Sequence, residues 1–447
     1  MRPIAWLLAV LLFVAVLGTA IGFLRAGREP PPGVSEPTWE VVAPARAIAE
    51  DYVGARKCAP CHEKIYEQQR HSHMANALRT VEDYQRIKGP LPQGSVYDDA
   101  SDIQYDIVRA GESLLLKVSH GSESTELPIV YALGSGANGV SFLHELTDSV
   151  VELRVSFYPD SDDWDLTPGQ VELHERPADP DRRRGVIQAV GLRFGKDSSN
   201  NCLKCHSTLL VQKDGRVDPV RSHFGVTCER CHGPGREHVE SVLRGDNVPP
   251  HNWQVDADLK RLDLESPDPE VQATNREMRL CGECHGGDKT QEKDLRLSRF
   301  HVAALMKSKC YAQVPTMLRC TDCHDPHGNA VRGDPGPYVQ VCLACHRDPA
   351  ENPAKAVDDA PSGIDRLRKR LPSAPQGEGP GGRGITSSRR ICSVNPRDDC
   401  IRCHMPQRHP LYRSTFTLHR IGIHNADAEI YGSEYKRFNS RTSVQEP

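Results

Sequence analysis

Residues 201–239 carry the same five-residue pattern twice, as Cys202-Leu-Lys-Cys205-His206 and as Cys228-Glu-Arg-Cys231-His232. CxxCH is the attachment signature of c-type haem. Two cysteines at this spacing reach both vinyl groups of one porphyrin, and the histidine that follows places an imidazole under the iron. The second copy continues as Gly-Pro-Gly-Arg-Glu-His238, which adds another imidazole.

Five further CxxCH motifs lie outside this stretch, at residues 58–62, 281–285, 320–324, 342–346 and 400–404. We therefore predict seven covalently attached haem c groups. The attaching thiols would be Cys58, Cys61, Cys202, Cys205, Cys228, Cys231, Cys281, Cys284, Cys320, Cys323, Cys342, Cys345, Cys400 and Cys403. The proximal iron ligands would be His62, His206, His232, His285, His324, His346 and His404. Structural zinc also uses CxxC pairs, but zinc does not explain a histidine after the second cysteine in every copy.

The composition agrees with a chain that folds around cofactors. Of 447 residues only 38% are hydrophobic and 6% aromatic, so porphyrins would supply part of the apolar surface. The net charge of −4 is spread over interspersed charges of both signs, which gives no indication of a nucleic-acid partner.

The N-terminus carries an export signal. An unbroken apolar segment from Pro3 to Leu24 lies between Arg2 and Arg25, and its length is close to the ~20 residues that span a bilayer. We favour an uncleaved signal anchor over a cleaved signal peptide with Gly18-Thr-Ala20 as its cleavage site; a buried soluble helix is the third reading. Either export reading predicts a periplasmic or extracytoplasmic protein, because c-type haem is attached outside the cytoplasmic membrane.

The expected fold class is a mainly α multihaem cytochrome c fold with little regular secondary structure, plus an inserted small β-rich domain. The predicted segments are the signal anchor or signal peptide (1–27), a flexible tether (28–50), the first haem segment (51–90), the inserted β-rich domain (91–195), the central haem domain with five haems (196–348), a flexible linker (349–390), and the last haem segment with the C-terminal tail (391–447).

In the predicted insertion, apolar and polar residues alternate as they do in β-strands. Ile103, Tyr105 and Ile107 alternate with polar residues, as do Leu114, Leu116 and Val118, which predicts a β-hairpin turning at 110–111. A further strand is predicted through Leu127, Ile129 and Tyr131, and another over 151–157. The glycine cluster at 134–139 could cradle a phosphate if it opened a helix, but a turn is favoured in this β-rich setting.

Thirteen histidines lie outside the motifs, enough for a second ligand on every iron. The candidate distal ligands are His71, His73, His223, His238, His301, His327 and His419, with His409 and His424 as further choices. His71 and His73 are expected on a polar helix from Glu67 to Leu78, as a ligand source or as a solvent-exposed pair. His301 is expected on a helix over 298–308, and another helix is expected over 273–280, before Cys281.

Two of the sixteen cysteines, Cys310 and Cys392, belong to no motif. An even remainder in an exported chain suggests a disulfide. Two free thiols, or an axial thiolate on one iron, are the alternatives.

The chain resembles the multihaem cytochrome c superfamily that includes the four-haem electron-transfer cytochrome of nitrifiers and the octahaem hydroxylamine oxidoreductases. The stretches that carry the resemblance are 225–239 (Gly-Val-Thr-Cys-Glu-Arg-Cys-His-Gly-Pro-Gly-Arg-Glu-His-Val), 320–328 (Cys-Thr-Asp-Cys-His-Asp-Pro-His-Gly), and 399–406 with 418–421. Residues 131–169 look like the β segment of uncharacterised exported members. The resemblance covers most of 52–424 and implies helical haem packing with stacked and perpendicular haem pairs, and largely bis-histidine iron.

The chain also departs from the family's enzymes, and three functions stay open. It has no CxxCK motif, which the nitrite reductases carry, and seven motifs where the hydroxylamine enzymes use eight haems. The leading hypothesis is an electron carrier between redox partner proteins, held at a membrane by its N-terminal segment; homo-oligomer formation is left open. The alternative is a reductase or oxidoreductase acting on a small nitrogen or sulfur compound at one open-faced haem, with no nameable catalytic residue. A third hypothesis makes the β domain a docking or sensing module.

Overall fold

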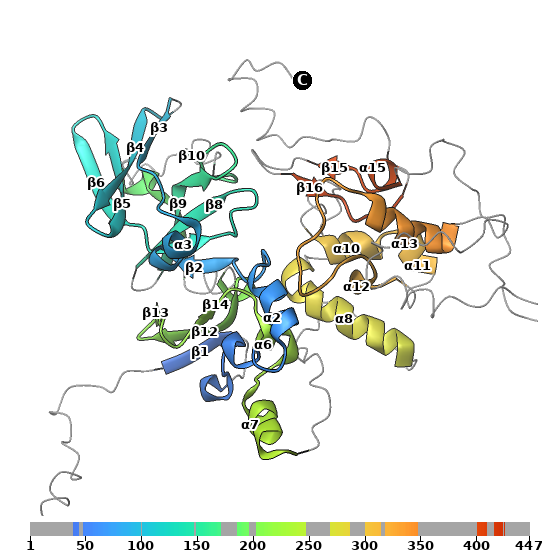
Figure 1. Cartoon of the computed structure of the whole chain (residues 1–447). Helices are drawn as coiled ribbons and strands as arrows, with labels where there is room; N and C mark the ends of the chain where they lie inside the picture. The colour runs from blue at the N-terminus through green and yellow to red at the C-terminus, as the bar shows by residue number, and fades with distance from the viewer. Residues whose placement is uncertain are drawn as a thin grey trace, which may run out of the picture. The chain divides into compact units, whose positions relative to one another are not determined.

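The computed structural model describes residues 39–43, 48–99, 101–146, 149–170, 186–195, 203–246, 269–286, 300–313, 318–346, 400–408, 415–422 and 424 (Figure 1). The chain divides into two units, Met1–Trp39 and Glu40–Pro447, and β1 (Trp39–Ala43) spans their boundary. The predicted N-terminal anchor (1–27) and linker (349–390), and most of the predicted tether, lie outside the described residues. Among the residues that are described, no helix is long and apolar enough to cross a bilayer.

The insertion begins with a four-stranded antiparallel sheet in chain order: β3 (Gly94–Asp98), β4 (Ile103–Ala110), β5 (Ser113–His120) and β6 (Glu123–Pro128). The predicted hairpin is present as β4 and β5, where Tyr105 lies opposite Val118 and Ile107 opposite Leu116. These four side chains are buried, because alternate residues of a strand project to the same face.

A second sheet has the order β10-β9-β8-β7-β2, with β11 paired to β9. Its strands are β2 (Leu78–Thr80), β7 (Tyr131–Leu133), β8 (Val140–Glu145), β9 (Ser149–Tyr158), β10 (Asp163–Leu166) and β11 (Gly191–Gly195). The short helices α3 (Val81–Lys88) and α4 (Val186–Ala189) adjoin it in sequence. Because β2 pairs with β7, the chain just after the first motif is hydrogen-bonded into this sheet.

One hydrophobic core is common to the two sheets and includes Ile107 of β4, Leu116 of β5, Phe142 of β8 and Leu153 of β9. A buried ion pair also joins the sheets. Arg154 of β9 and Asp98 of β3 lie 3.0 Å apart, with each side chain only 2% exposed.

The strand predicted through Leu127, Ile129 and Tyr131 is wrong, because the structure has two strands there. β6 ends at Pro128 in the first sheet, and β7 begins at Tyr131 in the second. Proline has no N–H with which to continue a ladder. The N–H of Val130 already donates to the carbonyl of Leu143 in the second sheet. The predicted strand over 151–157 is present within β9, and residues 134–139 connect β7 to β8 as the favoured turn.

The polar helix predicted from Glu67 to Leu78 also needs correction, because α2 spans Glu63–Arg70. Beyond it, the Asn76 amide donates to the carbonyls of Arg70 and Ser72, at 3.0 and 2.8 Å. The Ser72 hydroxyl accepts the N–H of Ala75 at 3.1 Å. Such side-chain bonds to the backbone compete with helical ones, so His71 and His73 follow the helix instead of lying on it.

A small sheet follows the second motif directly. β12 (Ser207–Lys213) pairs with β13 (Arg216–Val217) and with β14 (His223–Phe224). After β14 the N–H of Val226 donates to the carbonyl of Met74 at 2.8 Å. Gly225 permits this approach: its φ is +75°, and a Cβ there would lie 2.1 Å from the Ala75 carbonyl oxygen. A glycine is therefore needed where the chain after the first motif meets the third.

The other described elements are mostly helices that contain or flank motifs. They are α6 (Cys228–His232), α7 (Arg236–Arg244), α8 (Pro269–His285), α10 (His301–Met306), α11 (Lys309–Gln313), α12 (Cys320–Cys323), α13 (Gly336–His346) and α15 (Cys400–His404), followed by β15 (Gln407–Arg408) and β16 (Phe416–Thr417). The predicted helix over 273–280 is part of α8. Within 298–308, the helix begins at His301.

Candidate haem-binding sites

A turn of helix places the two thiols and the imidazole of a CxxCH motif side by side. In α6, Cys228, Cys231 and His232 stand at positions i, i+3 and i+4, which lie on one face of a helix. The fifth and seventh motifs begin α12 and α15, and the fourth and sixth end α8 and α13. Two thiols and one imidazole on one face can hold one porphyrin.

Hydrogen bonds orient two of the predicted proximal imidazoles. Nδ1 of His206 lies 3.1 Å from the carbonyl oxygen of Ala77, and Nδ1 of His404 lies 2.9 Å from that of Gly422. A carbonyl oxygen can only accept, so Nδ1 carries the proton and Nε2 is left with a lone pair for iron. This is the usual partner arrangement for a metal-binding histidine.

The predicted distal ligands are oriented differently from one another. His419 resembles the proximal ligands, since its Nδ1 lies 2.9 Å from the Thr417 carbonyl oxygen. Nδ1 of His327 lies 3.6 Å from an Asp325 carboxylate oxygen. His424 is reversed: its Nε2 lies 2.9 Å from the Arg420 carbonyl oxygen. His419 therefore leaves Nε2 for a metal, whereas His424 uses it for a carbonyl.

His232 and His327 lie parallel, at a centroid separation close to that of two ligands on one iron. Their ring planes differ by 2° and their ring centroids are 6.3 Å apart. Two imidazoles bound trans to one metal, each at about 2 Å, place their ring centroids roughly 6 Å apart. The donor set at this site thus fits haem iron.

Four further ligand candidates form a histidine cluster, defined as His285, His301, His324 and His419. The centroid of His301 lies 5.1 Å from that of His285 and 4.3 Å from that of His419, while His324 and His419 are 6.0 Å apart. The distance between His324 and His419 suits trans ligation of one metal, and the other two distances are shorter than that geometry requires.

Burial keeps the histidine cluster neutral. It lowers the pKa of His301 to about 2 and that of His419 to about 4, with neighbouring imidazoles adding to the effect. Burial also lowers the pKa values of His285 and His324. A neutral imidazole is the form that binds iron.

Three other candidates, His71, His73 and His223, show no such pairing in the described part of the chain. Nδ1 of His71 lies 2.7 Å from the Glu67 carbonyl oxygen, and Nδ1 of His73 lies 3.2 Å from the Ser135 hydroxyl. His223 lies edge-on to Tyr52. Within the described residues, no ring contact joins these three histidines to a motif histidine. His238 lies on α7, and His409 is outside the described residues.

The predicted disulfide stays a prediction. Cys310 lies in α11, and burial raises the pKa of its thiol. Cys392 is outside the described residues, as is the motif cysteine Cys202, and Cys345 is described only by its backbone. In the described part of the chain, no three His, Cys, Asp or Glu residues are grouped as ligands of a bare metal ion.

Thiols of different motifs lie against one another. Contact with Cys58 lowers the pKa of the Cys228 thiol to about 7, and contact with Cys284 lowers that of Cys205 to about 6. The Cys281 thiol contacts that of Cys320, which raises the pKa of Cys281. The first motif is thus next to the third, the second next to the fourth, and the fourth next to the fifth.

Contacts between helices show which further motifs are neighbours. α12 lies against α13, and α13 lies against α15, so the fifth, sixth and seventh motifs are neighbours in turn. Cys231 of the third motif is within electrostatic reach of Cys281 of the fourth. The motif neighbours therefore run in the order first, third, fourth, fifth, sixth and seventh, with the second beside the fourth.

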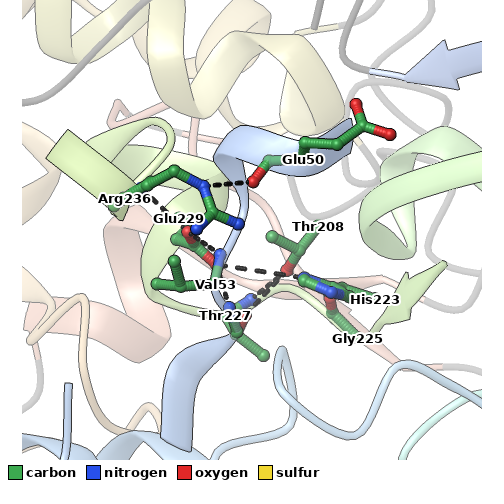
Figure 2. Close-up of polar contacts among 10 residues, drawn as sticks. Glu50, Val53, Thr208, His223, Gly225, Thr227, Glu229 and Arg236 are labelled. Atoms are coloured by element: carbon green, nitrogen blue, oxygen red, sulfur yellow. Dashed lines mark hydrogen bonds and ion pairs between the residues drawn. The ribbon is translucent and has the colours of Figure 1, made fainter. Parts of the chain in front are cut away.

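Polar residues at and near the variable positions of the motifs tie these neighbours together. Glu229 is the first variable residue of the third motif and is 2% exposed. Its carboxylate accepts the N–H groups of Val53, Gly54 and Gly235 at 2.8 to 2.9 Å. Figure 2 shows Glu229 beside Val53, with Arg236 reaching the Glu50 carbonyl. The third motif is thus bonded to the chain that leads into the first.

Two more ties follow the same pattern. Arg230 and Glu283, variable residues of the third and fourth motifs, form an ion pair at 2.8 Å. Glu277, one turn before Cys281 on α8, accepts from the N–H and the hydroxyl of Thr321 in the fifth motif, at 2.7 and 3.1 Å. Sequence reasoning missed these residues, and the available signal was the presence of charged residues between the cysteines.

Comparison with known proteins is consistent with the motifs. Residues 176–233 match the family described as cytochrome c554 and c-prime, and residues 314–351 match the doubled CXXCH motif. The multiheme cytochrome MtrA of Shewanella baltica (strain OS185) is 25% identical over 227 residues, which cover 41% of this chain. The chain spans 61% of the length of that relative. Among solved structures, the outer cell wall cytochrome OcwA is 15% identical, covers 50% of this chain and 37% of its own, and has a TM-score of 0.23, too low to establish a shared fold.

Proposed function

We propose that the chain, which is similar to multihaem c-type cytochromes and carries CxxCH motifs that bind haem c, is an exported electron carrier with seven haems. The finer assignment, to the superfamily of the nitrifier four-haem cytochrome and the octahaem hydroxylamine oxidoreductases, is part of this proposal. So is the mainly α fold class for the haem-binding segments.

The order of the motifs in space carries the proposal. Neighbouring motifs contact one another from the first to the seventh, by the thiol pairs Cys58–Cys228 and Cys281–Cys320 and by the contacts of α12, α13 and α15. Each bound haem would supply a one-electron Fe(III)/Fe(II) couple. Residues that hold such couples side by side form a path for electrons.

The chain's own residues position this path and protect it. The motif cysteines anchor each porphyrin, and carbonyl bonds to Nδ1 of His206, His404 and His419 aim Nε2 at the iron. Paired imidazoles such as His232 and His327 would fill both axial positions. An iron ligated on both sides carries electrons without offering a site to a substrate.

The ends of the path are its most open points. Cys61 of the first motif and Cys403 of the seventh are exposed, whereas the other described motif cysteines with assigned burial are partly buried. We propose that redox partner proteins exchange electrons at these ends. The proposed location is extracytoplasmic, with residues 1–27 as a membrane anchor.

Electron paramagnetic resonance (EPR) of the oxidised protein at low temperature tests the proposal. The expected result is low-spin iron only, no spectral change when carbon monoxide is added after reduction, and an intact mass that includes seven haems. A high-spin signal that binds carbon monoxide would contradict it. That outcome would favour a reductase of a small nitrogen or sulfur compound, to be screened with nitrite, hydroxylamine, sulfite and tetrathionate.

A further inference from the structure

Three motifs meet at one ion pair. Arg230 belongs to the third motif and Glu283 to the fourth, and their charged groups are 2.8 Å apart. The second motif reaches the same point. The Sγ of Cys205 lies 3.8 Å from the carbonyl oxygen of Glu283, and the Sγ of Cys284 lies 3.7 Å from the carbonyl oxygen of Cys205. In the loaded protein these sulfurs are thioether links to haem.

The pair is shielded from water. Only 10% of the Arg230 side chain and 9% of the Glu283 side chain are exposed. The guanidinium also contacts the Sγ of Cys284 and lies within electrostatic reach of Cys205. Charges in such a position are screened far less by salt and water than surface charges are.

The chain contains a matched pair that lacks this shielding. Arg236 and Glu240 lie 3.5 Å apart on α7, a few residues after the third motif, with 46% and 53% of their side chains exposed. The two pairs combine the same residue types. They differ in burial and in contact with the motif sulfurs.

The step at issue is electron exchange among the irons bound at His206, His232 and His285. Haems held at these motifs would supply one-electron Fe(III)/Fe(II) couples, and exchange between two of them would move no bond or proton. A nearby positive charge favours the reduced iron, and a nearby negative charge favours the oxidised one. The Arg230–Glu283 pair presents both charges to all three sites.

We propose that the Arg230–Glu283 pair sets the relative reduction potentials of these three sites, and so decides how electrons divide between the main path and the branch at the second motif. This inference rests on the proposed function. It assigns a positioning role in electron transfer to two residues inside the CxxCH motifs.

The test is a redox titration of the fully loaded protein, with samples frozen at set potentials and read by EPR. Arg230→Gln removes a positive charge near these sites, so the affected potentials should fall. Glu283→Gln leaves Arg230 uncompensated, so they should rise. Each shift should be at least tenfold in the reduction equilibrium, or about 59 mV for one electron. The double variant should return close to wild type, and Arg236→Gln and Glu240→Gln should not shift.

Shifts in the same direction for both single variants, or no shift at full haem content, would overturn the inference. If Arg230→Gln fails to load haem, Arg230→Lys keeps the charge and should keep the potentials, and Glu283→Gln alone still has to shift upward. Loss of haem from every variant of the pair would also overturn it, by showing a purely structural role. Failure of the proposed function is seen separately, as a high-spin, carbon monoxide-binding signal in the wild-type protein.

Discussion

The imidazole of His327 lies parallel to that of His232, to within 2°, with 6.3 Å between the ring centroids. His232 ends the third motif, whereas His327 follows the fifth, just beyond α12. If both imidazoles hold the haem of the third motif, its ligands would come from separate motif segments. Haem binding and the packing of these segments depend on each other.

Replacing His327 should open that iron. In His327→Ala one low-spin EPR signal should become high-spin, and the reduced protein should gain carbon monoxide binding at one haem, because the remaining imidazole leaves the sixth position vacant. The control is His120→Ala, an exposed histidine at the end of β5, which should leave all signals unchanged. An entirely low-spin His327→Ala spectrum would assign the ligand elsewhere.

Replacing Glu229 should loosen the junction of the first and third motifs. In the wild type, three backbone N–H groups donate to the Glu229 carboxylate. In Glu229→Gln, the side-chain amide N–H₂ replaces one of the accepting oxygens and faces these donors. Leaving a buried donor unpaired costs about 1–3 kcal/mol, so the denaturation midpoint should fall. Glu240→Gln, at an exposed carboxylate on α7, is the control. Equal midpoints for the two variants would show that these bonds contribute nothing.

The β insertion should depend on its buried ion pair. Asp98→Asn removes the carboxylate charge that pairs with Arg154 in the core, and breaking a buried ion pair costs about 3–5 kcal/mol. The backbone amides of β9 should exchange hydrogen faster, by the factor to which this loss of free energy corresponds. Arg86→Gln, which breaks the exposed pair with Asp83, should cost less than about 1 kcal/mol. Unchanged protection of β9 in Asp98→Asn would contradict the prediction.

Before iron is bound, acid should weaken the histidine cluster. Burial lowers the pKa of His419 to about 4 in the folded chain, against about 6.5 in an unfolded one. The unfolded chain thus binds a proton first as pH falls. Stability should be unaffected above pH 6.5 and should decline by about 3 kcal/mol on going down to pH 4. Urea denaturation at several pH values measures this, and His419→Gln should show a shallower decline. If the unfolding free energy falls equally steeply with pH in both proteins, His419 is not the cause of the acid destabilisation.

Much of the chemistry was accessible from local sequence. The spacing of Cys228, Cys231 and His232 specifies two thiols and an imidazole on one helical turn, whatever the rest of the chain does. Alternation in 103–118 likewise predicted the hairpin of β4 and β5. The helix predicted to run to Leu78 failed because side-chain bonds from Ser72 and Asn76 replaced helical ones.

The sequence by itself determined that this protein binds haem c at CxxCH motifs, because attachment needs only residues within one turn of helix. Tertiary structure alone decided which motifs are neighbours. The first motif meets the third through Glu229 and Val53, which are far apart in the chain, and the second meets the fourth at Cys205 and Glu283. Such contacts depend on how the whole chain packs, which no local pattern of residues records.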